Sequence, residues 1–181
     1  MDGSGKWKVL KHRRVLKSKY LDVYMDKVRL PDGTVIEDYS LVKKPDYVVV
    51  VATDSKNRLL VLEEYKHGYG GFDHVIPGGF IGRGEKPVDA ARRELLEETG
   101  YGGGRFRYMG RLSDYSTKDM HKGYVVRADG IRKIGKTSHE ETETIRSIGL
   151  LGLEEVRKQI AGGKWHTTSC LAALLIAGIF K

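Results

Sequence analysis

Three glutamates lie close together near the end of a predicted helix. Glu94, Glu97 and Glu98 are three and four positions apart, so a helix over residues 87–99 would place their carboxylates on adjacent stripes. Like charges at this spacing cost roughly 0.2–0.5 kcal/mol per pair, and acids near a helix C-terminus oppose the helix dipole. A bound Mg²⁺ ion would reverse both penalties, because hard cations prefer oxygen ligands. The alternative interpretation is a solvated acidic face.

A glycine-rich loop, residues 78–84, precedes this helix. Pro87 is favoured in a first turn, where its missing N–H costs nothing, and Gly100 suits the left-handed conformation that ends many helices. One stripe of the helix is apolar and is expected to face the core: Val88, Ala91 and Leu95. The loop brings backbone carbonyls toward the acidic stripe, which favours metal binding over a solvated face.

The segment from Gly79 to Tyr101 resembles the signature box of the Nudix hydrolases. The matching positions are Gly79, Glu85, Arg93, Glu94, Leu95, Glu97, Glu98 and Gly100. Tyr101 departs from the pattern, which has an aliphatic residue there. The resemblance implies an α+β fold, the Nudix α/β/α sandwich with a mixed sheet. It also implies Mg²⁺-assisted hydrolysis, with Mn²⁺ as the alternative ion, of a nucleoside diphosphate linked to another group.

Features outside the box resemble the ADP-ribose and nucleoside diphosphate sugar pyrophosphatase branch of this family. They are residues 30–33 between two β segments, residues 63–68, and the acidic loop 140–146. This branch implies cleavage of the pyrophosphate bond to give a nucleoside monophosphate and a sugar phosphate. It also implies a homodimer that exchanges N-terminal strands. Departures from the ADP-ribose pattern are Lys66 in place of arginine, Gly78 in place of alanine, and no proline in residues 115–118.

The resemblance implies a set of metal ligands. They are the carboxylates of Glu94, Glu97 and Glu98 and the backbone carbonyl of Gly78. Arg93, beside this cluster, would orient a carboxylate by a forked hydrogen bond, and Arg93 and Glu97 are taken as catalytic residues. An exposed helical salt bridge is the alternative for Arg93. Glu85 matches the box and would either support the loop or hold a further metal ion.

The general base and the phosphate contacts are expected outside the helix. The register of the acidic loop points to Glu141 as the base, with Glu140 and Glu143 as alternatives, and an ordinary charged loop as the plain interpretation. Lys66 and Arg83 are candidate contacts to the phosphates, although Lys66 could instead be a surface lysine at a strand end.

Composition and charge exclude several classes of protein. The 181 residues are 40% hydrophobic and 31% charged, as in a soluble globular protein. The longest apolar run, residues 170–180, is about half the ~20 residues of a membrane span. The sequence starts without an apolar signal segment, and Cys170 is its single cysteine, so we expect a reducing, cytoplasmic location.

The net charge of +8 is concentrated in one segment. Residues 1–20 hold seven Lys and Arg against one acid, which accounts for +6, and the rest of the chain is nearly balanced. Such patches are not specific, so nucleic-acid binding is not expected. The segment does support a second hypothesis, RNA 5′-end pyrophosphohydrolysis. A third is a non-catalytic nucleotide-sugar sensor, which could dispense with the metal carboxylates.

The predicted elements run from strands to a helix, then strands, then helices, which indicates an α+β fold. The expected strands are residues 20–30, 34–42, 47–51, 59–62, 105–112 and 123–128. Besides helix 87–99, helices are expected around residues 153–160 and from 167 or 168 to 180. We expect an N-terminal antiparallel β segment, residues 1–44, that forms the dimer, and a Nudix domain, residues 45–181.

Several tyrosines and histidines are not expected to be site residues. They are Tyr39, Tyr47, Tyr65, His67, His74 and His121. Tyrosines in strands more often lie in the core or on a sheet face, and the histidines have no partner at motif spacing.

Overall fold

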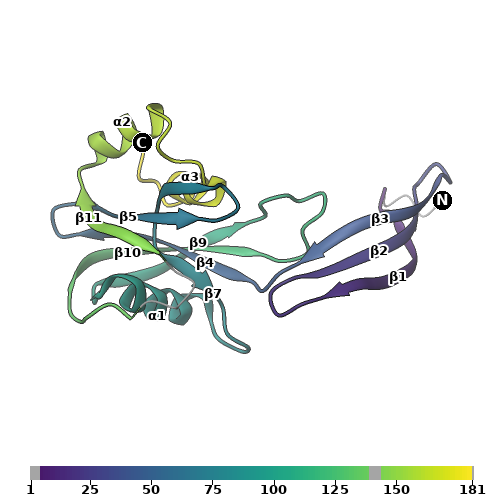
Figure 1. The fold of residues 1–181 in the computed structure, drawn as a ribbon, viewed down its shortest axis with the longest axis horizontal. Helices are drawn as coiled ribbons and strands as arrows, with labels where there is room; N and C mark the ends of the chain where they lie inside the picture. The colour runs from purple at the N-terminus through teal and green to yellow at the C-terminus, as the bar shows by residue number, and fades with distance from the viewer. Residues whose placement is uncertain (1–4, 139–143, 181) are drawn as a thin grey trace. The chain divides into compact units, whose positions relative to one another are not determined.

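The computed structural model describes residues 5–138 and 144–180. These residues form two compact units, one built from residues up to 45 together with 113–122, the other from 46–112 and 123 onward (Figure 1). The strands are β1 (Lys8–Lys17), β2 (Asp22–Arg29), β3 (Val35–Lys43), β4 (Tyr47–Asp54), β5 (Leu59–Lys66), β6 (Gly71–Val75), β7 (Gly78–Phe80), β8 (Tyr101–Gly102), β9 (Arg105–Leu112), β10 (Gly123–Lys133) and β11 (Ile145–Leu151). The helices are α1 (Pro87–Thr99), α2 (Leu153–Ala161) and α3 (Thr168–Ile176).

The first unit is a three-stranded antiparallel sheet in the order β1-β2-β3. Residues 30–33, between the two predicted β segments, form the turn that joins β2 to β3: Asp32 accepts a hydrogen bond from the Thr34 N–H at 2.9 Å, and Gly33 has a φ of +92°. The predicted antiparallel β segment is confirmed. The loop 113–122 joins this unit because the Val42 N–H donates to the Lys118 carbonyl and the Met120 N–H donates to the Val42 carbonyl.

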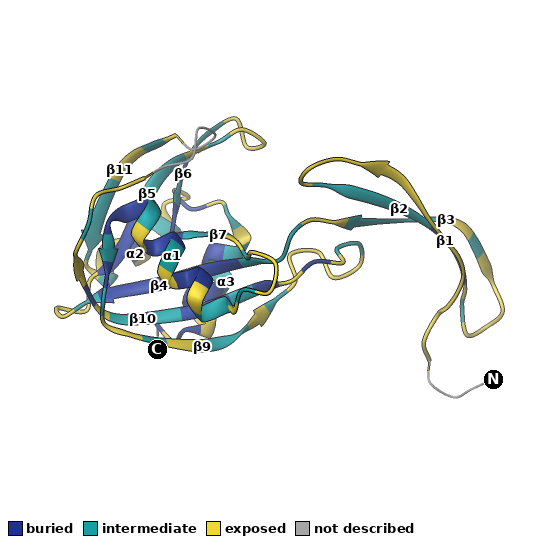
Figure 2. Ribbon diagram, turned by 90° about the horizontal axis from the view of Figure 1, so that it is seen from below, coloured by how far each residue is buried: buried dark blue, intermediate teal, exposed yellow. Residues whose placement is uncertain are grey.

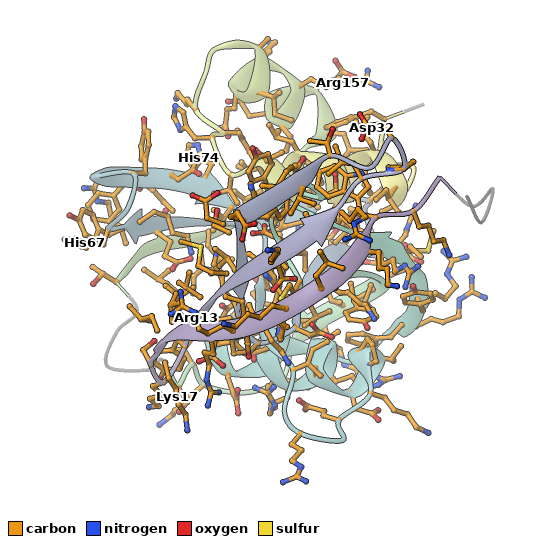
Figure 3. All side chains as sticks on the ribbon, turned by 90° about the vertical axis from the view of Figure 1, so that its right-hand side faces the viewer. Arg13, Lys17, Asp32, His67, His74 and Arg157 are labelled. Carbon is orange, nitrogen blue, oxygen red and sulfur yellow. The ribbon has the colours of Figure 1, made fainter. Side chains whose placement is uncertain are left out.

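Strand β1 was not among the predicted strands. All ten of its residues are exposed, and its sequence is dominated by Lys and Arg, so no apolar alternation marks it (Figure 2). The cationic side chains include Arg13 and Lys17 (Figure 3). Pairing with β2, which places Lys17 opposite Asp22, holds the strand in the sheet.

The second unit contains a mixed sheet with the order β11-β5-β4-β10-β8, to which β6, β7 and β9 add. Strands β4 and β10 are parallel, and the other pairs are antiparallel. Successive valines of β4 face opposite sides of the sheet. Val48 and Val50 belong to the core beneath α1, whereas Val49 and Val51 belong to the core beneath α2 and α3.

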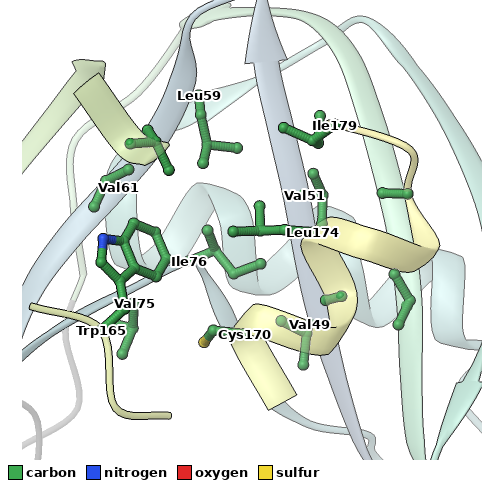
Figure 4. Close-up of a cluster of buried hydrophobic side chains, with 14 of the residues drawn as sticks. Val49, Val51, Leu59, Val61, Val75, Ile76, Trp165, Cys170, Leu174 and Ile179 are labelled. Carbon is green, nitrogen blue, oxygen red and sulfur yellow. The ribbon is translucent and has the colours of Figure 1, made fainter. Parts of the chain in front are cut away.

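The two cores on either side of the sheet confirm the expected α/β/α sandwich. On the α3 side, Trp165, Cys170 and Leu174 pack against β4 and β5 (Figure 4). On the other side, Ala91 and Leu95 of α1 are fully buried, as their stripe predicted.

The last predicted helix is shorter than expected. Helix α3 ends at Ile176 instead of residue 180, because Gly178 takes a φ of +66° and the chain turns. Ile179 is still buried, so the apolar pattern continued past the end of the helix and misled the prediction. Within the described residues, none of the helices has the length and apolar character needed to cross a membrane.

Candidate active site

Helix α1 places two carboxylates in buried positions. The helix begins at Pro87, after an extended Lys86, and ends at Gly100, whose N–H donates to the Leu96 carbonyl at 2.7 Å. Because the apolar stripe of α1 packs on the sheet, the acidic stripe lies along the margin of the core. Glu94 and Glu98 are only 8% and 5% exposed.

The glycine-rich loop lies directly against these carboxylates. The Gly78 N–H donates to Glu98 Oε2 at 3.0 Å. A Cβ atom at Gly79 would lie 2.4 Å from the carboxylate carbon of Glu94, and one at Gly78 would lie 2.3 Å from the Val48 carbonyl oxygen. Position 78 therefore requires glycine, and a side chain at Gly79 would displace the carboxylate of Glu94, so the two glycines let the backbone approach the acidic stripe.

Arg93 joins the loop to the helix through its guanidinium. Its Nε and Nη2 donate to the two oxygens of Glu85 at 3.0 Å each, which is the forked geometry expected from the sequence. Its Nη1 donates to Glu94 Oε1 at 2.6 Å and to Glu97 Oε2 at 3.1 Å. Nη2 also donates to the Phe80 carbonyl at 2.9 Å. One side chain thus fixes three carboxylates and the loop.

These bonds shift the proton affinities of the groups involved. The hydrogen bonds from Arg93 and from the Gly82 N–H hold the pKa of Glu85 below its usual value. The bonds to Glu85, and then those to Glu94 and Glu97, raise the pKa of Arg93 above its already high value. Glu85 supports the loop, one of the two roles expected for it.

A cavity of about 430 Å³ opens beside this cluster. Its lining residues are Tyr47, Val48, Val49, Glu64, Lys66, Val75, Ile76, Gly78, Gly79, Phe80, Arg93, Glu94, Glu98, Thr167, Ser169 and Cys170. It therefore brings together five of the predicted site residues: Lys66, Gly78, Arg93, Glu94 and Glu98.

The remaining predicted site residues are Glu97, Arg83 and Glu141. Glu97 is not among the lining residues and is tied to the site through Arg93. Arg83 is exposed on the loop and does not line this cavity. Glu141 and its alternatives, Glu140 and Glu143, lie outside the described residues.

Sequence reasoning missed several residues of the cavity. Tyr47 was expected in the core or on a sheet face, Glu64 lies in the segment 63–68 without a predicted role of its own, and Ser169 belongs to no motif. Thr167 was expected only as the start of a helix, which is its place in the structure. Burial raises the pKa of the Cys170 thiol to about 12, so this cysteine is not a nucleophile near neutral pH.

The donor set around α1 fits a hard divalent cation. We define the α1 cluster as Glu85, Arg93, Glu94, Glu97 and Glu98, whose four carboxylates and one guanidinium carry a formal charge of −3. Burying carboxylates in surplus over cations is costly unless a further cation compensates them. All the side-chain donors are oxygens, which suits Mg²⁺ or Mn²⁺.

A separate group of possible ligand atoms lies in the first unit. His121 Nε2 is 3.8 Å from both Asp114 Oδ2 and Asp119 Oδ2. The same distances are found where a histidine lies between two carboxylates in ordinary ion pairs. None of these three residues belongs to the α1 cluster.

Family models match nearly the whole chain. A NUDIX domain model matches residues 43–169, and a model of the nucleoside diphosphate sugar hydrolase N-terminal domain matches residues 7–42. The chain belongs to the Nudix family. Enzymes of this family generally use divalent metal ions, in agreement with the donor set of the α1 cluster.

Named proteins resemble this Nudix chain over different lengths. An ADP-ribose pyrophosphatase of Bacillus subtilis (strain 168) is 31% identical over 94 residues, which are 52% of this chain and 50% of that protein. The chain thus matches about half the length of this relative. A CMP-5'-(N-acetyl-N-hydroxy-3-aminopropyl)phosphonate hydrolase of Streptomyces rubellomurinus (strain ATCC 31215) is 26% identical over 170 residues, 94% of this chain and 81% of that one.

A solved structure shares the fold of this Nudix protein. The crystal structure of an ADP compounds hydrolase superposes with a TM-score of 0.83 and 21% identity. The match covers 95% of this chain and 92% of the other, so it includes both units of the fold.

Proposed function

We propose that this protein hydrolyses the pyrophosphate bond of ADP-ribose or of a nucleoside diphosphate sugar. One water molecule is consumed, and the products are a nucleoside monophosphate and a sugar phosphate. The observation that carries the proposal is the α1 cluster, with two buried carboxylates and an arginine on the wall of a cavity. The matching N-terminal family model and the ADP-ribose pyrophosphatase relative support this substrate class.

Glu94, Glu97 and Glu98, with the Gly78 carbonyl, would hold Mg²⁺ or Mn²⁺. When bound, the ion would neutralise the diphosphate and lower the pKa of a water molecule. Arg93 keeps the carboxylates of Glu94 and Glu97 in place before substrate arrives, so little reorganisation is needed. Without the ion, a cluster of charge −3 would repel a diphosphate, and activity should therefore depend on metal.

Glu141 is proposed as the general base. The Tyr65 N–H donates to the Thr144 carbonyl at 2.9 Å, and Ile145 pairs with Glu64, which lines the cavity. Thr144 and Ile145, the described residues that follow Glu141 in the chain, are thus anchored on β5 at the cavity, which supports a base from this loop.

Lys66 and Arg83 are proposed to contact the phosphates. Lys66 lies in the cavity with its Nζ 2.6 Å from Glu64 Oε1. An ammonium has three N–H donors, so the pairing leaves donors for a phosphate oxygen. Arg83 would reach the substrate from the loop that carries Gly82 and Gly84.

A homodimer with exchanged N-terminal strands is the proposed assembly. Strand β1 is exposed along its length, and its exposed side chains include large apolar ones that a second copy could cover: Val9, Leu10, Val15 and Leu16. We keep the reducing, cytoplasmic location inferred from the single cysteine, and we do not assign a nucleic-acid partner.

The test is a substrate panel with Mg²⁺ present. It contains ADP-ribose, ADP-, GDP- and UDP-sugars, dinucleoside polyphosphates and capped RNA, and products are identified by chromatography. Hydrolysis of at least one sugar-linked diphosphate to a nucleoside monophosphate and a sugar phosphate is expected, with loss of activity in EDTA. Hydrolysis of RNA ends alone, or ligand binding without turnover, would contradict the proposal in favour of the corresponding alternative.

A further inference from the structure

We propose that one part of the cavity wall recognises the hydroxyl groups of the sugar, with Ser169 as a residue that determines specificity and Asp73 as a residue that positions it. This part, the β5–α3 wall, consists of Glu64, Lys66, Thr167 and Ser169. The proposal rests on the proposed function for the class of substrate. It adds where in the cavity the sugar binds and which side chains recognise it.

Asp73 fixes the start of α3. Its carboxylate on β6 is 1% exposed. Its Oδ1 accepts from the His166 N–H at 2.9 Å and lies 3.2 Å from His166 Nδ1. Its Oδ2 accepts from the Thr167 N–H at 2.9 Å and from Thr167 Oγ1 at 2.7 Å. Both oxygens of a buried carboxylate are therefore used to hold two consecutive residues, which ties the first turn of α3 to the sheet.

Ser169 follows this anchor by two residues and lies in the cavity wall, half-buried. The Cys170 N–H donates to the Thr167 carbonyl at 3.1 Å, so the first turn is helical across Ser169. The serine hydroxyl is thus presented on a rigid helix whose origin is set by Asp73. Such a rigid support is what a group needs in order to discriminate between ligands.

Charged groups complete the β5–α3 wall. Glu64 and Lys66 lie at alternate positions at the end of β5 and pair at 2.6 Å, so together they are neutral. The charges of Lys66, Asp73 and Glu64 all act on the pKa of the buried Cys170 thiol, after the larger effects of burial and of a backbone hydrogen bond at Ile76. Glu64 and Lys66 line the same cavity as Thr167 and Ser169, and Asp73 accepts hydrogen bonds from Thr167, so the three charged groups lie around the start of α3.

Beyond Lys66, the proposed phosphate contact, the chemistry of this wall fits a sugar better than a phosphate. A carboxylate accepts from hydroxyl groups, an ammonium donates to them, and a serine hydroxyl does both, so neighbouring hydroxyls of a sugar can be satisfied together. A phosphate next to Ser169 would find no cation in this wall other than Lys66, whose charge is balanced by Glu64. A site built to bond substrate hydroxyls also rejects analogues that lack them, because its own polar groups are then left unpaired.

The experiment compares substrates with and without the sugar. Initial rates are measured with ADP-ribose and with the methyl ester of ADP, for the parent protein and for Ser169→Ala. Loss of one typical hydrogen bond should raise KM for ADP-ribose roughly 2–13-fold, with kcat within about twofold. KM for the methyl ester should not change. Ser55→Ala, in the exposed turn after β4, is the matched control and should leave both substrates unaffected.

Asp73→Asn tests the positioning role. The variant cannot accept all the bonds from His166 and Thr167, so KM for ADP-ribose should rise by a similar factor and KM for the methyl ester should not. The double variant Ser169→Ala/Asp73→Asn should be no worse than Ser169→Ala alone, because Asp73 acts through the serine. Additive losses, or equal losses on both substrates, would overturn the positioning role. If Asp73→Asn fails to fold, Ser169→Ala still decides the specificity claim.

A binding measurement separates this inference from the proposed function. Calorimetry with ribose 5-phosphate and methyl phosphate needs no turnover. Tighter binding of ribose 5-phosphate, weakened selectively by Ser169→Ala, supports the inference even if the parent hydrolyses none of the panel and the proposed function fails. Equal binding of the two phosphates, or an unchanged affinity in Ser169→Ala, would overturn the inference while leaving hydrolysis of the panel intact.

Discussion

The α1 cluster and the β5–α3 wall border one cavity and differ in charge. The α1 cluster has four carboxylates held by one guanidinium, whereas the β5–α3 wall has one carboxylate paired with one ammonium and two hydroxyls. A surplus of buried negative charge requires a cation, while a neutral set of donors and acceptors suits uncharged hydroxyls. Under the proposed function, these two parts of the cavity wall suit the two ends of the substrate, the metal-bound diphosphate and the uncharged sugar.

The largest expected effect comes from removing the first unit. If the exchanged strands complete the partner's site, a single chain lacks residues that catalysis requires. Deleting residues 1–44 should abolish both dimerisation, measured by sedimentation, and hydrolysis. A folded, fully active monomer would show instead that the cavity of the second unit is complete by itself.

The next effect concerns an acid that belongs to neither part of the wall. Glu141→Gln leaves the α1 cluster and the β5–α3 wall unchanged, so metal and substrate affinities should be nearly those of the parent. Loss of a general base should lower kcat by about 10²–10⁴-fold and flatten the acidic limb of the pH–rate profile. If kcat remains near the parental value, the role passes to Glu140 or Glu143, which the same substitution tests.

A smaller effect is expected when the cation of the β5–α3 wall is removed. Lys66→Ala breaks the pair with Glu64 and leaves that carboxylate uncompensated beside a diphosphate. The lost contact is equally strong in the bound substrate and in the transition state, so KM should rise about tenfold with kcat nearly unchanged. Thermal stability should change little, because the ammonium is partly exposed. Kinetic constants equal to those of the parent would make Lys66 a surface residue only.

The sequence predicted the α1 cluster far better than the β5–α3 wall, and the reason is physical. Pro87, the acidic stripe and Gly100 act within a few residues of one another, so local rules determine the helix. The β5–α3 wall brings Glu64 of β5 and Ser169 of α3 into one cavity, although they are far apart in the sequence, and no local pattern predicts this. Thr167 was predicted as a helix start, but its anchor, Asp73, lies 94 residues earlier.

Strand β1 and the end of α3 were mispredicted for related reasons. Pairing with β2 forms β1 despite its charged sequence, which gives no period-two apolar signal. At the end of α3, the apolar residues run on through Ile179, and the conformation of Gly178 ends the helix. At neither place does sequence hydrophobicity report the conformation of the backbone.

The smallest expected effect is on stability and depends on pH. Arg93 and the Gly82 N–H lower the pKa of Glu85 in the folded state. The ionised Glu85 therefore contributes to folding stability at pH values above the pKa that it has in the unfolded chain. That contribution is lost as the pH falls through the folded pKa. Glu85→Gln should therefore lower Tm by about 2–4 °C at pH 7 and less at pH 3. If Glu85→Gln lowered Tm more at pH 3 than at pH 7, the downward shift of the Glu85 pKa would be contradicted.

The central claim is that the carboxylates of α1 bind a divalent cation, and Glu98→Gln tests it most directly. Mn²⁺ binding is measured by electron paramagnetic resonance, alongside turnover with Mg²⁺. The matched control is Glu154→Gln on α2, where the side chain is 79% exposed. Metal affinity and turnover should fall together in Glu98→Gln, and excess metal should restore part of the activity. The metal-free variant should be no less stable than the metal-free parent, because repulsion between like charges is relieved. Parental Mn²⁺ affinity in Glu98→Gln would contradict the account.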